Sequence, residues 1–337
     1  MSEKKKLKVI IPVAGYGTRL RPHTLTQAKV LINVAGKPMI SFIVEDIIKT
    51  KIADEIILIT GIFGDKIATY LTDNYKANFT FIEQTEALGL GHAIYCAREN
   101  IRKKDNVLII LGDTLFDVNL KAIAQSKYSL IGIKRVDNPK RFGVVETNSN
   151  GFITRMVEKP ESEEVSPSKD AIVGIYLIRN PLLLFNSLEH IIANGIQTKS
   201  EFQLTDALQL MLDNGEKMKT FKVDGWLDCG KIETLLSTNE YLLKKHNNKY
   251  IIKTCKIIPP VYIAHTAKIT GSIIGPNVTI CDGVVVTNSK ISHTIIHNNS
   301  VIENSNLSQS LLGYQTRITK FSGTINLGDY SEITGSE

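Results

Sequence analysis

Two patterns of apolar and polar residues follow one another along this chain, and the change comes after Lys253. Before that point, short apolar runs alternate with segments whose apolar residues recur every three or four positions. The runs predict buried strands and the periodic segments predict helices. The expected strands are 7–13, 55–60, 79–83 and 107–111, and the expected helices are 39–50, 65–74 and 90–99. This alternation indicates an α/β domain with a Rossmann-like, mostly parallel mixed sheet and helices on both faces.

After Lys253, apolar residues recur every five or six positions from Ile263 to Ile318, and Asn or Gly occupies many of the intervening corners. This hexapeptide period predicts a short left-handed parallel β-helix, whose faces stack coil on coil. A series of sandwich strands is the alternative, but the unbroken step length favours the β-helix. The number of steps predicts about three coils, with the entrance at Pro259 and Pro260.

Two domains are therefore expected, an α/β domain at 1–250 and a hexapeptide-repeat domain at 251–337, which suits a chain of 337 residues. A β-helix of this length needs a cap or a packing partner. Because stacked coils offer flat, self-complementary faces, we expect the β-helix to mediate contacts in a homo-oligomer.

The composition excludes several classes of protein. No apolar run approaches the roughly 18 residues that a membrane span needs, and the basic segment 1–8 lacks a signal-peptide core and predicts a solvated tail. A net charge of +6 fits a small anionic substrate and is too diffuse to indicate nucleic-acid binding. The four cysteines are far apart without metal-ligand spacing. We therefore expect reduced thiols in a cytoplasmic protein.

A glycine-rich turn, residues 15–19, follows the first expected strand. Its glycines allow backbone N–H groups to converge on phosphate oxygens. A dinucleotide-binding fingerprint would need a third glycine where Leu20 stands, and the Gly-Lys-Ser/Thr of a Walker loop is absent. Such a turn alone is a weak signal. Two cations nearby, Arg19 and Lys29, make a polyphosphate the better interpretation.

Three further clusters have ordinary structural interpretations when each is taken alone. Segment 84–92 is a Gly-rich helix entry, Asp113 at the end of an apolar strand is a helix cap, and segment 158–160 is a surface hairpin with a turn proline. However, ligands of parallel sheets bind at the carboxyl ends of the strands. That rule places the glycine turn and Asp113 at one edge of the sheet.

Motifs along much of the chain resemble those of the sugar-nucleotide pyrophosphorylases, which include glucose-1-phosphate thymidylyl- and uridylyltransferases and mannose-1-phosphate guanylyltransferases. The resemblance extends to about Tyr241, and two positions depart from the frequent family residues, Ala14 (often Gly) and Ala28 (often Pro). The motifs are Gly15-x-Gly17-Thr18-Arg19-Leu20-x-Pro22, Lys29-x-Leu31, Gly36-Lys37-Pro38, Arg141-Phe142-Gly143-Val144-Val145, Glu158-Lys159-Pro160, Glu201-Phe202-x-Leu204-Thr205-Asp206 and Trp226-x-Asp228-x-Gly230.

The resemblance implies that residues 1–250 form a catalytic domain and gives a role to each cluster. The residues implied to bind the nucleoside triphosphate are Ala14, Gly15, Gly17, Thr18, Arg19, Gln84 and Gly89. Those implied to bind the sugar 1-phosphate are Gly143, Glu158, Lys159 and Val173. Asp113 and Asp228 would bind Mg²⁺, and Arg19, Lys29 and Lys159 would hold the reacting phosphates. Lys199 stands where some relatives have an arginine that would make a second phosphate contact.

The expected reaction joins dTTP or UTP to glucose 1-phosphate and releases pyrophosphate. Specificity for mannose 1-phosphate with GTP, or for N-acetylglucosamine 1-phosphate with UTP, stays open. A non-catalytic regulatory subunit is a further alternative, although the loop and metal residues are all present. Acetyl transfer by the β-helix, which carries His265, His293 and His297, is less favoured because about three coils leave little room for a coenzyme A site.

Overall fold

A computed structural model describes residues 6–245 and 250–335, and these residues form two compact units. Unit 1 comprises residues 6–15 and 43–226, and unit 2 comprises residues 16–42, 227–245 and 250–335. The expected domain boundary at residue 250 adjoins residues 246–249, which lie outside the described residues, and it stays a prediction. Most of the expected solvated tail, residues 1–5, also lies outside them. No described helix is long and apolar enough to cross a membrane.

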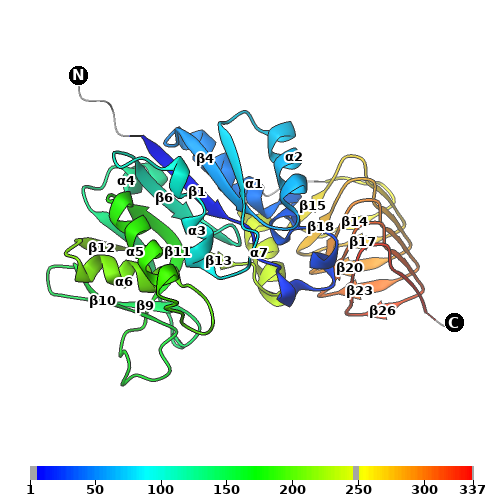
Figure 1. Cartoon of the computed structure of the whole chain (residues 1–337). Coiled ribbons are helices and arrows are strands. Elements are labelled where there is room, and N and C mark those ends of the chain that lie inside the picture. The colour runs from blue at the N-terminus through cyan, green and yellow to red at the C-terminus, as the bar shows by residue number, and fades with distance from the viewer. Residues whose placement is uncertain (1–5, 246–249, 336–337) are drawn as a thin grey trace. The chain divides into compact units, whose positions relative to one another are not determined.

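The core of unit 1 is a nine-stranded mixed sheet (Figure 1). Its parallel part has the order β6-β1-β4-β5, with β6 Asn106–Ile110, β1 Leu7–Pro12, β4 Glu55–Thr60 and β5 Phe79–Glu83. Antiparallel strands continue the sheet from β6: β11 Asp170–Ile178, β9 Gly143–Thr147, β10 Ile153–Glu158 and β8 Ser129–Arg135. Strand β12 (Met218–Lys222) pairs with β8 in parallel, while β7 (Thr114–Asp117) and β13 (Gly225–Asp228) lie outside this sheet.

The helices of the α/β part are amphipathic, and each buries its apolar stripe. Their bounds are α1 Met39–Thr50, α2 Gly64–Asn74, α3 Leu90–Tyr95, α4 Leu120–Ala124, α5 Pro181–Ala193 and α6 Leu204–Asp213, with a 3-10 turn η4 at Arg98–Asn100. Helices α3, α5 and α6 pack against one another, and side chains such as Ile94, Leu188 and Leu208 join the sheet residues in one buried cluster. The expected α/β fold class is confirmed. The helix expected at 90–99 ends early, because a 3-10 turn replaces its last part.

Unit 2 contains three parallel five-stranded sheets, which form the three faces of a β-helix (Figure 1). The first has β14 Lys256–Ile257, β17 Ile273–Ile274, β20 Lys290–Ser292, β23 Asn306–Ser308 and β26 Ser322–Gly323. The second has β15 Val261–Ile263, β18 Val278–Ile280, β21 Ile295–Ile296, β24 Leu311–Leu312 and β27 Asn326–Leu327. The third has β16 Lys268–Thr270, β19 Val285–Thr287, β22 Val301–Glu303, β25 Arg317–Thr319 and β28 Glu332–Thr334.

The β-helix is longer than the sequence pattern predicted. Five strands in each sheet give five coils, so the expectation of about three coils was wrong. The first coil begins at Lys256, before the entrance expected at Pro259 and Pro260. The last coil is hard to recognise in the sequence, because Gly323 occupies the position that pairs with Leu307.

Unit 2 also contains the segment 16–42, which residues 43–226 separate from the rest of the unit in the sequence. This segment forms short elements: η1 Thr18–Leu20, η2 His23–Leu25, η3 Lys29–Leu31, β2 Asn33–Val34 and β3 Lys37–Pro38. Helix α7 (Ile232–Lys245) links it to the β-helix through Asn239. The Asn239 Oδ1 accepts hydrogen bonds from Ala35 N (2.8 Å) and Thr279 Oγ1 (2.6 Å). One buried amide thus joins an N-terminal segment to a coil.

Candidate active site

The part of the glycine turn that belongs to unit 2, residues 16–19, is held in shape by contacts behind it. Gly17 has a left-handed backbone conformation (φ 61°), which glycine adopts without strain. A Cβ on Gly17 would lie 2.9 Å from Thr24 Cγ2 and 3.1 Å from Lys29 Cβ. The Thr24 hydroxyl also donates to the Gly17 carbonyl at 2.9 Å. Lys29 is buried. Both expected phosphate cations, Arg19 and Lys29, belong to unit 2.

Gly230 brings an acidic and a basic side chain together in unit 2. A Cβ on Gly230 would lie 2.8 Å from Asp228 Oδ1 and 3.1 Å from Arg19 Nη2. The Gly230 N–H donates to Asp228 Oδ1 at 2.8 Å. The absence of a side chain at Gly230 therefore leaves room for Arg19 and Asp228, which are far apart in the sequence.

In unit 1, Ala14 and Asp113 follow neighbouring parallel strands. Gly112 N donates to Pro12 O at 3.3 Å, which holds the two strand ends together. Gly61 follows a third strand, β4, and a Cβ on Gly61 would lie 2.7 Å from Ala14 O. The end of β4 therefore lies close to Ala14. Asp113 is half-buried and accepts from the Thr114 hydroxyl at 3.2 Å. The strand-end rule therefore located this edge of the sheet from the sequence.

The turn between β5 and α3 fixes the amide of Gln84. Its Nε2 lies 3.2 Å from Gly89 O and 3.0 Å from His92 Nδ1. Gly89 has φ 105°, and a Cβ there would lie 2.8 Å from Phe202 O. Since both amide hydrogens have acceptors, Gln84 Oε1 is the atom that can accept a hydrogen bond from a ligand.

A second polar cluster in unit 1 surrounds Glu158 at the end of β10. One carboxylate oxygen, Oε2, accepts from the Thr205 hydroxyl at 2.7 Å, and the other, Oε1, lies 3.3 Å from Lys159 Nζ. A Cβ on Gly143 would lie 2.9 Å from Glu158 Oε2. Lys159 itself has φ 47°, and its N–H donates to Phe142 O at 3.0 Å. The strained backbone thus holds the lysine beside the carboxylate.

Thr205 is the one polar partner of Glu158 to which the sequence gave no role. It lies in the motif at 201–206 and enters the first turn of α6, so the motif carried the signal. Asp206 lies in the first turn of α6 and accepts from the Thr198 hydroxyl at 2.8 Å. Lys199 forms an exposed ion pair with Glu161 at 2.5 Å.

Buried side chains of β11 support the Glu158 cluster. Val173 is only 2% exposed, and Gly174 packs so closely that a Cβ there would lie 2.6 Å from Leu111 Cδ1. Burial raises the pKa of Tyr176 well above its usual value, and the nearby charge of Glu158 raises it further. The Tyr176 hydroxyl is therefore a neutral group at physiological pH.

The expected site residues fall into two sets. Unit 1 holds Ala14, Gly15, Gln84, Gly89, Asp113, Gly143, Glu158, Lys159 and Val173, and unit 2 holds Gly17, Thr18, Arg19, Lys29 and Asp228. Among the described residues, no three His, Cys, Asp or Glu side chains form a metal cluster. A magnesium site built from one or two carboxylates and substrate phosphates needs no such cluster. Asp113 lies in unit 1 and Asp228 in unit 2, and their role as magnesium ligands stays a prediction.

Comparison with known proteins assigns the fold and the motifs to one family. Residues 8–245 match the family model described as nucleotidyl transferase. The chain belongs to this family. The match covers the sheet, the glycine turn and helix α7, and the β-helix follows it.

Some relatives in this nucleotidyl transferase family extend well beyond the part that aligns with this chain, and others align over nearly their whole length. The chain is 35% identical over 269 residues to the bifunctional protein GlmU of Methanococcus maripaludis, with 80% of this chain and 60% of that protein aligned. It thus spans well under two thirds of the length of this relative. It is 26% identical to a glucose-1-phosphate thymidylyltransferase of Streptomyces griseus, over 96% of this chain and 98% of that protein.

A solved structure shares the α/β part. The crystal structure of a UDP-glucose pyrophosphorylase complexed with UDP-glucose aligns with a TM-score of 0.61 and 26% identity. The alignment covers 72% of this chain and all of that one. The similarity therefore concerns the nucleotidyl transferase part of this chain.

Proposed function

We propose that this nucleotidyl transferase joins a nucleoside triphosphate to a sugar 1-phosphate and releases pyrophosphate. The preferred substrates are UTP or dTTP and glucose 1-phosphate. The observation that supports this most is the Glu158 cluster, where an acceptor for sugar hydroxyls and a cation for a phosphate lie side by side. Similarity to a glucose-1-phosphate thymidylyltransferase over nearly its whole length supports the same substrates.

The amide of Gln84 supports a base that carries a ring N–H group. Because its two hydrogens point to Gly89 and His92, its oxygen would accept from the N3–H of uracil or thymine. Cytosine and adenine present an acceptor at the corresponding edge, and that acceptor would oppose the Gln84 oxygen. Guanine has an N1–H, so exclusion of GTP depends on the size of the base.

The sugar 1-phosphate would bind between Gly143 and Lys159. The ammonium of Lys159 would bind the phosphate as a point charge, and Glu158 would accept from hydroxyls of the sugar. The hydroxyl of Thr205 fixes one oxygen of that carboxylate at 2.7 Å. Glu158 is thereby oriented before the sugar binds, which lowers the entropic cost of binding.

The proposed reaction is an in-line displacement at the α-phosphorus. An oxygen of the sugar phosphate forms a bond to this phosphorus while the bond to the bridging oxygen of the β-phosphate breaks, and pyrophosphate leaves with the electron pair. The nucleophile is already an anion, so no general base is required, and positioning and charge neutralisation supply the rate enhancement. Lys159 would hold the nucleophile, and Arg19 and Lys29 would stabilise the departing pyrophosphate.

Magnesium is the expected cofactor. Bound by Asp113, Asp228 and phosphate oxygens, it would neutralise charge on the reacting phosphates. Arg19 would contribute a second positive charge, since it lies beside Asp228 at Gly230. The pair would bind a magnesium–triphosphate complex better than either group alone.

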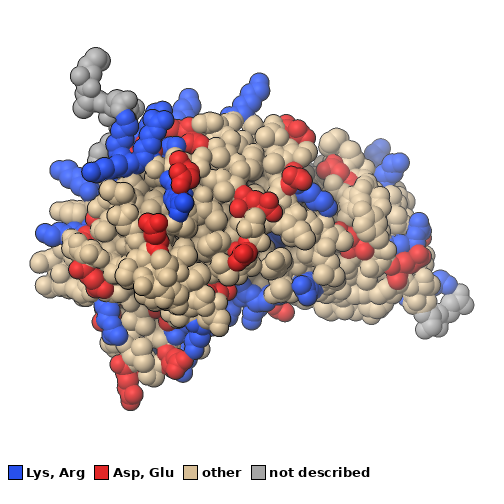
Figure 2. Space-filling view, viewed as in Figure 1, with Lys and Arg blue, Asp and Glu red and all other residues tan. Residues whose placement is uncertain are grey.

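The expected partners are these two substrates and further copies of the chain. Acidic and basic side chains both occur on the face drawn in Figure 2, and the net charge is only +6. We do not expect a nucleic-acid partner. The flat strand ladders of the β-helix support a homo-oligomer. All four cysteines are free thiols, as a reducing cytoplasmic compartment would favour.

A substrate matrix tests the proposed function. Each of UTP, dTTP, GTP, CTP and ATP is combined with glucose, galactose, mannose, glucosamine and N-acetylglucosamine 1-phosphates, and pyrophosphate release is followed. The highest kcat/KM is expected for UTP or dTTP with glucose 1-phosphate. Activity only with GTP and mannose 1-phosphate, or only with UTP and N-acetylglucosamine 1-phosphate, would contradict the preferred substrates. No activity with any pair would favour a regulatory subunit.

A further inference from the structure

The last coil of the β-helix makes specific hydrogen bonds to the segment just after the glycine turn. Asn326 Oδ1 lies 2.5 Å from His23 Nε2, and Asn326 Nδ2 donates to Arg21 O at 3.3 Å. His23 is completely buried, and its Nδ1 has no hydrogen-bond partner among the described residues. Asn326 is thus the one side chain in the described part of the chain that hydrogen-bonds this buried ring.

A second residue of the same coil, Asp329, holds the other end of the segment. The Thr26 hydroxyl donates to Asp329 Oδ2 at 2.5 Å, and the Tyr314 N–H donates to Asp329 Oδ1 at 2.8 Å. Between the two polar anchors, Gly328 packs against Pro22, since a Cβ on Gly328 would lie 3.0 Å from the Pro22 ring. Asp329 therefore connects the segment to the preceding coil as well.

The anchored segment in turn supports the glycine turn. Thr24 lies between the two anchored residues, His23 and Thr26, and its hydroxyl donates to Gly17 O at 2.9 Å. Its methyl group occupies the space into which a Cβ on Gly17 would project. Any shift of Thr24 must therefore move the backbone of Gly17 or break the hydrogen bond between them.

From this chain of contacts we infer that Asn326 and Asp329 are positioning residues for triphosphate binding. They act through His23 and Thr26 on Thr24, and through Thr24 on the backbone of the glycine turn. The inference rests on the proposed binding of the triphosphate by this turn. It assigns the end of the β-helix an indirect part in the affinity for the nucleotide.

The energetic argument depends on burial. When a buried polar group loses its hydrogen-bond partner, the folded state loses more free energy than it gains from an exposed hydrogen bond. The reason is that the buried group cannot form a replacement hydrogen bond with water. Removal of the Asn326 amide would leave both nitrogens of His23 without a described partner. The segment 21–26 would then change conformation so that the His23 ring becomes hydrated. Only a minority of the molecules would keep the glycine turn in its binding-competent conformation.

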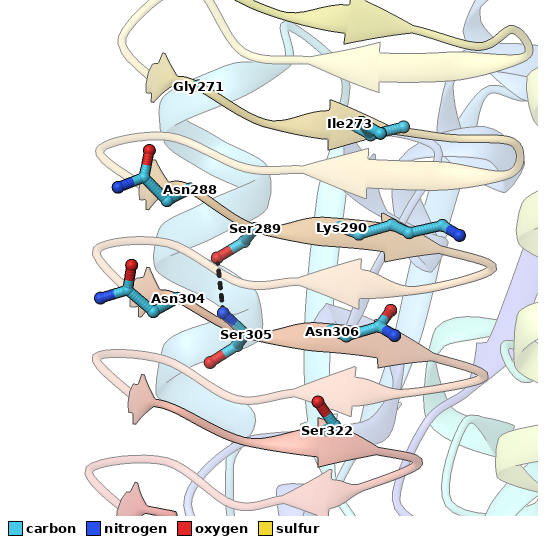
Figure 3. A pocket seen from close by; sticks show the side chains of 9 residues that line it. All are labelled: Gly271, Ile273, Asn288, Ser289, Lys290, Asn304, Ser305, Asn306 and Ser322. Carbon is cyan, nitrogen blue, oxygen red and sulfur yellow. Dashed lines mark hydrogen bonds between the residues drawn. The ribbon is translucent and has the colours of Figure 1, made fainter. Parts of the chain in front are cut away.

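Paired variants test the inference by isothermal titration of UTP and dTTP in the presence of Mg²⁺. Asn326→Ala and Thr26→Val should each raise the Kd of the triphosphate about tenfold. Thr26→Ser keeps the hydroxyl and should bind as the wild type does. Asn306→Ala is the matched control, because Asn306 lies on another sheet of the same β-helix, in the shallow groove of Figure 3, and contacts no part of the turn.

A double-variant cycle and a turnover assay separate positioning from general stability. The effects of Thr26→Val and Asp329→Ala on the Kd should be less than additive, because both variants lose the hydrogen bond between Thr26 and Asp329. Asp329→Ala also loses the acceptor of the Tyr314 N–H. In turnover, KM for the triphosphate should rise while KM for the sugar 1-phosphate stays within twofold. Unchanged triphosphate affinity in Asn326→Ala and Thr26→Val would overturn the inference. Equal loss of affinity for both substrates, with a lowered melting temperature, would also overturn it, since that result indicates a purely structural role.

These measurements distinguish failure of the inference from failure of the proposed function. If the wild type binds the triphosphate but forms no nucleotide sugar, the proposed function fails and the affinity test still stands. If the wild type turns over normally and Asn326→Ala does too, only the inference fails. If the wild type binds no triphosphate, both are contradicted.

Discussion

The Nζ of Lys159 lies 3.3 Å from a carboxylate oxygen of Glu158, and the lysine backbone is left-handed. The ion pair is partly exposed, so it contributes little to stability. Its geometry instead places a cation and an acceptor next to each other at the end of β10. A strained residue at a polar cluster is a feature of binding sites, where the surrounding structure compensates for the strain.

The Lys159 ammonium should be needed for turnover and not for folding. Lys159→Ala is expected to lower kcat by about 100-fold or more, as loss of one preorganised electrostatic group does in other enzymes. Lys159→Arg should recover only part of this, because a planar fork does not replace a point charge. Lys217→Ala, which removes an exposed lysine elsewhere in unit 1, should have wild-type kinetics. Wild-type kcat in Lys159→Ala would contradict the assignment.

The hydroxyl of Thr205 should affect the sugar 1-phosphate selectively. Thr205→Val keeps the shape but removes the donor to Glu158, and a lost hydrogen bond to a carboxylate is worth about 1.5–3 kcal/mol. We expect kcat/KM for the sugar 1-phosphate to fall at least about tenfold, with KM for the triphosphate unchanged. Thr205→Ser should restore most of the loss. A parallel fall for both substrates would argue against the proposed orientation of Glu158.

The fixed amide of Gln84 should determine which bases are accepted. Gln84→Ala is expected to lower kcat/KM for UTP and dTTP while CTP is little affected, so that discrimination between the bases narrows. The reason is that a site built to accept from a ring N–H penalises a base that lacks it. The ratio of kcat/KM values for UTP and CTP measures this directly. An unchanged ratio would show that Gln84 does not contact the base.

Two buried histidines should make unit 2 less stable in acid. Burial and the nearby His23 together lower the pKa of His297 to about 4, despite Asp329. Burial also lowers the pKa of His23, despite Asn326 and Asp329. In the unfolded chain both titrate near 6.5. Below pH 6.5 the unfolded state therefore binds more protons, so the free energy of unfolding falls towards pH 4 and is unaffected above pH 7.

Urea unfolding at pH 7.5 and pH 5 can check this effect of the histidines. The expected contribution of His297 between pH 6.5 and 5 is about 2 kcal/mol. His297→Gln should reduce the loss of stability on acidification, whereas His265→Gln, which changes an exposed histidine of the same β-helix, serves as the reference. Equal pH dependence of the wild type and His297→Gln would exclude the buried ring as the cause.

The sequence predicted the parts of the fold that depend on local periodicity. The strand at 55–60 and the helix at 39–50 have the predicted bounds, because their apolar residues alone determine which face is buried. The β-helix was recognised from the same kind of signal. Its length was underestimated, because the last coil has Gly323 where earlier coils have isoleucine or leucine.

Contacts between distant segments were the part that the sequence could not predict. The meeting of Arg19 and Asp228 at Gly230, and of His23 and Asn326, depends on how the chain folds back over long intervals. Neither pair has a periodic signature. The role of Thr205 was missed for the same reason, since a threonine in the first turn of a helix is ordinary unless its distant partner is known.

The most direct test of the proposed function is product formation from UTP or dTTP and glucose 1-phosphate with Mg²⁺. The nucleotide sugar and pyrophosphate should appear in equal amounts, both should depend on the sugar phosphate, and Asp228→Asn should abolish most of this turnover while its far-UV circular dichroism stays that of the wild type. Pyrophosphate release that does not depend on any sugar phosphate, or undiminished synthesis by Asp228→Asn, would contradict the account.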